Sequence, residues 1–242
     1  MTKRATILLL LSVLAAFAAS PAGVFPQQML NKNRGKIHRI DNNFAVTDVT
    51  NSSWKRADKI SVSTYWNGEK APVGRSFTAR LLWSDTHLYV LFEAQQAEPL
   101  VLADNPMLTS KTMNLWDRDV CEIFLAPDKR ESRKYFEFEV APTGEWLDVA
   151  LDLTSGKRVS NWDYDSEMEA AAKMMRDHVT LALKVPWTAF GKKPKAGEIW
   201  LGNLLRCIGK DPNRGYLAWS PTMTKEPAFH VPEKFGEFEF VN

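Results

Sequence analysis

Residues 115–150 read LWDRDVCEIFLAPDKRESRKYFEFEVAPTGEWLDVA and contain two runs in which side chains of different polarity alternate. A period of two is typical of a β-strand, because successive side chains point to opposite faces of a sheet. The charged segment between the runs predicts a turn, so the stretch is expected to form a hairpin. Glu122 and Glu139 fall within these strands among aromatic residues. Burying a carboxylate there without a partner is costly. Each glutamate should therefore accept from a hydrogen-bond donor, lie at the rim of the fold, or bind a ligand.

Similar alternation recurs along the chain. Residues 77–83 and 87–94 predict a second hairpin around the polar segment 84–86. Strands are also expected at 147–153, 179–185, 200–208, 216–220 and 236–241, whereas 168–175 fits a strand or a short helix, and the architecture favours a strand. Nine or more short strands without a long amphipathic helix predict an all-β fold: a single-domain antiparallel β-sandwich of immunoglobulin-like or jelly-roll type.

The N-terminus has the features of a secretory signal peptide. Lys3 and Arg4 precede an apolar run at 5–13, and Ala16 and Ala18 supply the small residues of a cleavage site. The run is too short to span a bilayer, so we expect cleavage after residue 18, no membrane span afterwards, and a secreted or periplasmic protein. Residues 19–36 are expected to be a flexible leader and residues 37–242 the folded domain.

The charge balance excludes one class of partner. The chain carries 31 basic and 29 acidic residues, and loss of residues 1–18 would remove two basic residues and leave the numbers equal. A protein without net charge or a basic block lacks what nucleic-acid binding requires, so we expect no nucleic-acid partner. Cys121 and Cys207 could pair in an oxidising compartment or remain buried thiols, and the sequence leaves both open.

Seven short motifs occur in order along the chain: ARLLWSDTHLYV (79–90), LWDRDVCEIFL (115–125), YFEFEVAP (135–142), VPW (185–187), GNLLR (202–206), AWSP (218–221) and FHVPEKFG (229–236). With these motifs the chain resembles the family 9 carbohydrate-binding modules, the cellulose- and xylan-binding sandwich domains of secreted bacterial proteins. The resemblance implies non-catalytic binding of a glucose- or xylose-based saccharide in the service of polysaccharide catabolism. It also allows for a structural calcium ion, to which no ligands are assigned. A role as a protein-interaction scaffold, with a protein partner, stays open as an alternative.

Family members clamp the sugar between two aromatic side chains and hold its hydroxyl groups with polar ones. By resemblance, the saccharide-binding residues expected here are Trp116 and Phe229 for stacking and Glu122, Glu139, Arg206 and His230 for the hydroxyls. Phe229 stands where the family has a tryptophan, and Glu139 replaces a basic residue.

Several of these residues also have structural interpretations. Trp116 could cap the core, and Arg206 could pair with Glu122 across neighbouring strands. His230 is expected at a rim rather than on a metal, because no second histidine lies at ligand spacing. The remaining strand tryptophans are expected in the core: Trp83, Trp187, Trp200 and Trp219.

Two further functions are considered. Hydrolysis of glycosidic bonds needs two carboxyl groups, for which Glu122 with Glu139, or Asp119 with Glu122, are the candidates. A haem-binding electron-transfer sandwich would need axial ligands such as Met107 or Met113 with His87 or His230. The sequence contains no GxSxG or HExxH motif.

Overall fold

The computed structural model describes residues 32–242, so the expected signal peptide and residues 19–31 of the expected leader lie outside the described residues. The strands are β1 (Arg34–Arg39), β2 (Ile60–Val62), β3 (Phe77–Trp83), β4 (His87–Gln95), β5 (Val120–Ala126), β6 (Lys134–Val140), β7 (Trp146–Asp152), β8 (Val159–Asn161), β9 (Glu169–Met174), β10 (His178–Pro186), β11 (Ile199–Ile208), β12 (Gly215–Ala218) and β13 (Gly236–Val241). Short 3-10 helices lie at η1 (Ser52–Arg56), η2 (Leu115–Asp117), η3 (Lys129–Glu131), η4 (Trp187–Phe190) and η5 (Pro232–Lys234). Within residues 32–242, no helix has the length and apolar content needed to cross a membrane.

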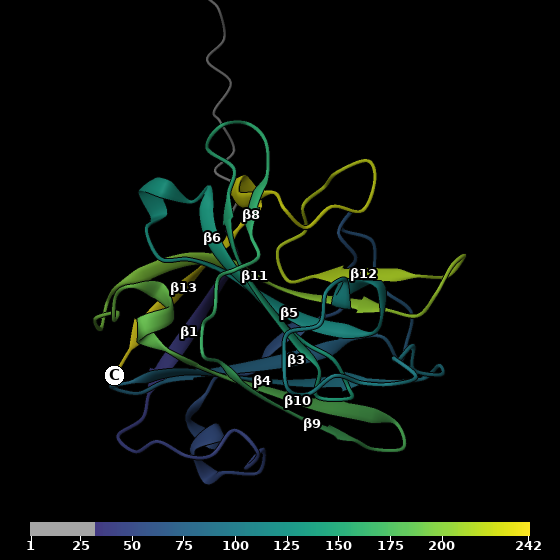
Figure 1. Ribbon diagram of the computed structural model, residues 1–242, viewed down its shortest axis with the longest axis horizontal. Helices are drawn as coiled ribbons and strands as arrows, with labels where there is room; N and C mark the ends of the chain where they lie inside the picture. The colour runs from purple at the N-terminus through teal and green to yellow at the C-terminus, as the bar shows by residue number, and fades with distance from the viewer. Residues whose placement is uncertain (1–31) are drawn as a thin grey trace, which may run out of the picture. The chain divides into compact units, whose positions relative to one another are not determined.

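The strands of residues 32–242 form one curled sheet that folds over itself into a sandwich. Its order is β8-β7-β6-β5-β11-β13-β1-β3-β4-β10-β9, with β12 added to β11 and β2 added to β3. Figure 1 shows β5, β6 and β11 crossing over β3, β4 and β10. Strand β1 pairs in parallel with β13 and with β3 and so links the two halves, whereas the other strand pairs are antiparallel. The expected all-β sandwich is confirmed.

Strand β1 begins at Arg34, three residues before the expected start of the domain at residue 37. The segment RGKIHR carries little apolar alternation, and Ile37 is its one fully buried apolar side chain. Its pairing partners, β13 and β3, are distant in the sequence, so local pattern gives little sign of this strand. Gly35 allows close approach, because a Cβ there would lie 2.7 Å from the side chain of Ile60.

Both predicted hairpins form. β3 pairs with β4 and β5 pairs with β6, with Glu122 directly opposite Glu139 in the second pair. The ambiguous segment at 168–175 forms strand β9, in which Ala171 pairs with Ala182 of β10. The pairing with β10 overrides the helix propensity of Glu, Ala, Lys and Met.

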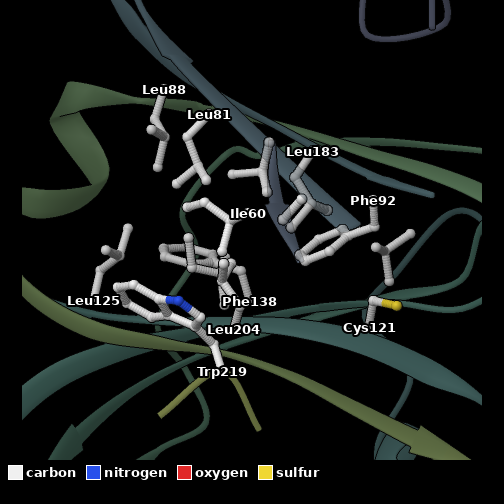
Figure 2. Close-up of a cluster of buried hydrophobic side chains, with 14 of the residues drawn as sticks. Ile60, Leu81, Leu88, Phe92, Cys121, Leu125, Phe138, Leu183, Leu204 and Trp219 are labelled. Atoms are coloured by element: carbon white, nitrogen blue, oxygen red, sulfur yellow. The ribbon is translucent and has the colours of Figure 1, made fainter. Parts of the chain in front are cut away.

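The main core lies between the two halves of the sandwich (Figure 2). Its upper side chains in that view come from β3, β4 and β10 and its lower ones from β5, β6 and β11; among those labelled are Leu81, Leu88, Phe92, Leu125, Phe138, Leu183 and Leu204. The four tryptophans expected in the core are at most 9% exposed. A second apolar cluster covers the opposite face of β5, β6, β7 and β11. Cys121 belongs to the first cluster and Cys207 to the second, so the two free thiols lie on opposite faces of the sheet.

Candidate functional site

A cavity of about 340 Å³ opens on the outer face of β5, β6, β7 and β11, and we call it the Trp116 pocket. Its volume falls within the range of roughly 300–1,000 Å³ that is typical of small-molecule sites. Aromatic side chains, carboxylates and an arginine line it together, and the full lining is Trp116, Asp117, Glu122, Glu137, Leu151, Arg158, Ser160, Trp162, Cys207, Tyr216, Pro227, Ala228, Phe229 and His230.

Trp116 is held by the short helix η2 that leads into β5. The preceding Leu115 is fully buried and anchors the helix in the second apolar cluster. Arg214 donates to the carbonyl oxygens of Trp116 and Arg118, and its guanidinium lies 5.4 Å from the ring centre of Tyr216. This network fixes the backbone of Trp116 while its indole stays partly exposed to the pocket.

Trp162 supplies a second indole that the sequence did not mark as a site residue. It follows β8, the edge strand that pairs with β7, and its side chain is 38% exposed. The ring centres of Trp162 and Trp116 lie 6.1 Å apart, and their planes are tilted by 31°. The fold therefore builds a two-indole surface along one side of the pocket.

Phe229 and His230 line another side of the Trp116 pocket. The Phe229 ring packs edge-on against Tyr216 at 6.0 Å. Nδ1 of His230 shares a 2.8 Å hydrogen bond with the Tyr135 hydroxyl, and the imidazole stacks on Phe124 at 5.2 Å. Burial lowers the pKa of His230 to about 3, with Arg158 adding to the effect, so the ring is neutral near physiological pH.

Three glutamates lie beneath the aromatic side chains. Glu137 and Glu139 are two residues apart on β6 and so share one face, and Glu122 lies opposite Glu139 on β5. Each offers a carboxylate oxygen that lies within 4.8 Å of the others, and all three side chains are buried. Glu122 and Glu137 line the pocket, whereas Glu139 is fully buried and is not part of the lining.

Burial makes these carboxyl groups weak acids. Loss of solvation raises the pKa of Glu137 to about 7. It also raises the pKa of Glu122 and of Glu139 well above the ordinary value, and the negative charge of neighbouring glutamates adds to the effect in both. The Sγ of Cys207 donates to Glu122 over 3.4 Å. The carboxyl groups of Glu139 and Glu137 hydrogen-bond each other, and the Glu139 oxygens have no other partner among the described residues.

The expected pair of Arg206 with Glu122 does not form. Arg206 lies opposite Cys121 in the β5–β11 pairing, whereas Glu122 lies opposite Leu205. This offset of one residue turns the guanidinium to the other face of the sheet. There Arg206 donates to the carbonyl oxygens of residues 75 and 95 and to the side chain of Gln96, so it braces the sandwich and does not line the pocket.

Other expected combinations are also separated. Both Asp119 carboxylate oxygens are engaged, one by the backbone N–H of Gly209 at 2.7 Å and the other by Gln96, so Asp119 does not join Glu122 at the pocket. His87, Met107 and Met113 do not line the pocket that contains His230. The pocket thus does not bring together the proposed haem ligands.

The three glutamates fit the calcium ion that the family resemblance allows for. Their donor atoms are all oxygens, which suit a hard cation. The separation of up to 4.8 Å agrees with atoms that share one ion at Ca²⁺–oxygen distances of about 2.3–2.6 Å.

Sequence reasoning found four pocket residues and missed others. Trp116, Glu122, Phe229 and His230 line the pocket, whereas Glu139 and Arg206 do not. Glu137 could have been included, because its spacing from Glu139 puts both on one face of a strand. Asp117 also lies next to Trp116 in the stretch 115–150. Four other contributors come from segments whose relation to the β5–β6 hairpin depends on the tertiary fold: Arg158, Ser160, Trp162 and Tyr216.

Comparison with solved structures gives the same architecture. A candidate carbohydrate-binding protein from Bacteroides uniformis superposes with a TM-score of 0.69 at 15% identity, covering 86% of this chain and 99% of that one. A family 9 carbohydrate-binding module from Caldicellulosiruptor kristjanssonii, in complex with cellotriose, gives 0.63 at 16% identity, covering 87% and 94%. A further structure from that organism, a family 9 module in complex with glucose, gives 0.60 at 16% identity, covering 86% and 96%. At identities this low, the TM-scores show a shared fold alone.

No curated protein sequence matches the chain. The model of one protein family, described as "Carbohydrate family 9 binding domain-like", matches residues 47–242. This range contains every strand from β2 to β13 and the whole Trp116 pocket. The match confirms the resemblance found in the motifs, and the chain belongs to the carbohydrate family 9 binding domain-like family.

Proposed function

We propose that the protein binds glucose- or xylose-based saccharides in the Trp116 pocket without cleaving them. The observation that carries this proposal is the pairing of two indoles with carboxyl groups around one cavity. An indole packs against the apolar face of a pyranose, and carboxyl groups accept or donate hydrogen bonds to its hydroxyls. Family membership and the likeness to modules solved with cellotriose and glucose support the same ligand class.

The spacing of the indoles suggests how the sugar lies. A pyranose between two rings needs a gap of roughly 7 Å, twice the carbon contact distance of about 3.5 Å. Trp116 and Trp162 are 6.1 Å apart and not parallel. In this proposal the sugar rests across the two indoles as on a platform, with its hydroxyls towards Glu122, Glu137, Arg158 and His230.

The charge states favour binding over hydrolysis. A glycosidase keeps one carboxyl protonated and the other ionised by giving them different environments. Here burial raises the pKa of Glu137 to about 7 and the pKa of Glu122 and Glu139 well above the ordinary value, so none of the three is fully ionised at neutral pH.

The cellular role follows from the N-terminal sequence. Residues 1–18 resemble a signal peptide, which supports a secreted or periplasmic protein. There the protein would hold fragments of cellulose or xylan for catabolism by other proteins, with contact to one of them as a further role. Fractionation of the host cell tests the location, and recovery of the protein in the cytoplasm would remove this part of the proposal.

Isothermal titration calorimetry of the wild type and Trp116→Ala against cello- and xylo-oligosaccharides tests the binding function. Weak binding, with a Kd of about 1 µM to 1 mM, is expected for a small polar ligand on two stacking rings. Binding by the wild type that is lost in a folded Trp116→Ala variant would support the proposal. No heat with any oligosaccharide, or release of shorter sugars during the titration, would contradict non-catalytic binding.

A further inference from the structure

Strand β9 forms an open edge of the sheet. It ends the strand order next to β10, and its other side pairs with no strand of residues 32–242. It has six residues, whereas β8 at the opposite end of the order has three. Figure 1 shows β9 beyond β10, at the lower rim of the layer that contains β3 and β4. An open edge of this length presents backbone groups to which another strand can pair.

The hydrogen bonds of the β9–β10 hairpin show which backbone groups of β9 point outward. The N–H of Met175 donates to the carbonyl oxygen of His178 over 2.9 Å and closes the hairpin. Hydrogen-bonded pairs alternate along antiparallel strands, so the odd-numbered residues of β9 bond to β10. The even-numbered residues direct their N–H and C=O groups away from β10, and these groups have no hydrogen-bond partner among the described residues: Ala170, Ala172 and Met174.

The sequence of β9, EAAAKM, is complementary to itself in charge. When two β9 strands pair antiparallel about Ala171, Glu169 of each copy lies opposite Lys173 of the other. These are non-hydrogen-bonded pairs, in which side chains lie closest, and opposite charges there stabilise the pairing. The same register puts Ala170 opposite Ala172 of the second copy, so their outward N–H and C=O groups bond to each other. A shift of two residues, the smallest that keeps the outward groups paired, separates Glu169 from Lys173 in either direction.

The side chains along β9 leave room for a second copy. The alanines at 170–172 are small and only partly buried, so two backbones can approach closely. Lys173 is exposed and forms no ion pair among the described residues. Glu169 binds Lys184 of β10 through Oε1 at 2.5 Å and keeps Oε2 for a further cation. Met174 is 51% exposed at the end of the strand, where a second copy would cover it.

We propose that two copies of this chain associate through β9, paired antiparallel about a twofold axis at Ala171, so that the sheet of one copy continues into that of the other. A twofold axis makes each contact occur twice, which gives two Glu169–Lys173 pairs across the interface. A lysine on an edge strand normally discourages pairing, but here the second copy supplies its glutamate. No residue of β9 lines the Trp116 pocket, so this association goes beyond saccharide binding and is tested without a sugar.

Sedimentation equilibrium of the purified protein, at concentrations up to about 500 µM, tests the association. The interface is one strand wide, so we expect a reversible dimer with a Kd of about 100 µM or tighter. Ala172→Pro removes an outward N–H and none that bonds to β10, and proline is tolerated at such edge positions. It should weaken the dimer at least about tenfold. A wild type that stays monomeric over the whole range would overturn the proposal.

Exchange of the charges tests the register. Lys173→Glu places glutamates opposite each other and Glu169→Lys places lysines opposite each other, so each variant alone should be monomeric. An equal mixture of the two should dimerise again, because every contact then joins opposite charges. Lys210→Glu, exposed after β11, is the matched control and should dimerise as the wild type does.

The variants also give the results that would refute the interface. Dimers that persist in folded Lys173→Glu and Ala172→Pro would place the contact elsewhere on the molecule. A mixture of the two charge variants that stays monomeric would refute the register about Ala171. Should Glu169→Lys fail to fold by circular dichroism, since it loses the ion pair with Lys184, the comparison of Lys173→Glu with Lys210→Glu carries the test.

Discussion

The indole rings of Trp116 and Trp162 face one cavity with their centres 6.1 Å apart, although one ring precedes β5 and the other follows the edge strand β8. Both rings should contribute to saccharide affinity. Trp162→Ala is expected to weaken binding by about 1–2 kcal/mol, or about 5–30-fold in Kd, through loss of one stacking partner. Val159→Ala, an exposed position on β8 outside the pocket lining, should leave the Kd unchanged in the same calorimetric titration. Equal Kd values for Trp162→Ala and the wild type would remove Trp162 from the site.

The buried Glu137 carboxyl should make stability depend on pH. Its pKa is raised from 4.5 to about 7, so the folded state holds a proton that the unfolded state releases between these values. The stabilisation is fully present below about pH 4.5 and is lost as the pH rises through about 7, with a magnitude on the order of 3 kcal/mol.

Urea unfolding in calcium-free buffer measures this dependence. Glu137→Gln should reduce the loss of stability between about pH 5 and about pH 8, because glutamine stays neutral throughout. A wild-type free energy of unfolding that rises over this interval, or a slope that Glu137→Gln leaves unchanged, would refute this assignment.

Arg206 should matter for stability and not for the ligand. Its guanidinium is 2% exposed and donates to the carbonyl oxygens of residues 75 and 95. Arg206→Met would leave these acceptors unpaired and should lower the free energy of unfolding by about 2–4 kcal/mol. Urea unfolding measures the loss, and calorimetry at a temperature where the variant is folded should return the wild-type saccharide Kd. Loss of affinity at wild-type stability would instead put Arg206 in the site.

His230 should stay neutral over the physiological range. Burial lowers its pKa to about 3, so its NMR resonances should not shift between about pH 5 and about pH 8. In the unfolded protein, the histidine resonances should titrate near the ordinary value of about 6.5. A His230 titration near that value in the folded protein would show that its ring is solvated rather than packed on Phe124.

The strands were predictable wherever the sequence alternates, as in the two hairpins, since the pattern and the partner are local. Strand β1 was placed partly in the leader, because RGKIHR has little alternation and its partners β13 and β3 lie far along the chain. Trp116 and Glu122 could be predicted as site residues because they lie in the stretch that the alternating sequence predicts as a hairpin.

The error at Arg206 has a specific cause. The hairpin fixes Glu122 opposite Glu139, but the alignment of β5 on β11 depends on contacts distant in sequence. There Arg206 meets Cys121 and not Glu122, and one step of register moves a side chain to the other face. Trp162 was missed for a similar reason, because only the pairing of β8 with β7 brings it beside Trp116.

Titration of the labelled protein with cellotriose, followed through its tryptophan indole N–H signals by NMR, tests the central claim most directly. Saccharide in the Trp116 pocket should shift the signals of Trp116 and Trp162 and leave those of Trp83 and Trp200, which lie in the core, in place. If saturating cellotriose leaves the chemical shifts of both Trp116 and Trp162 unchanged, or shifts only the indole signals of other tryptophans, the result contradicts a saccharide site in this pocket.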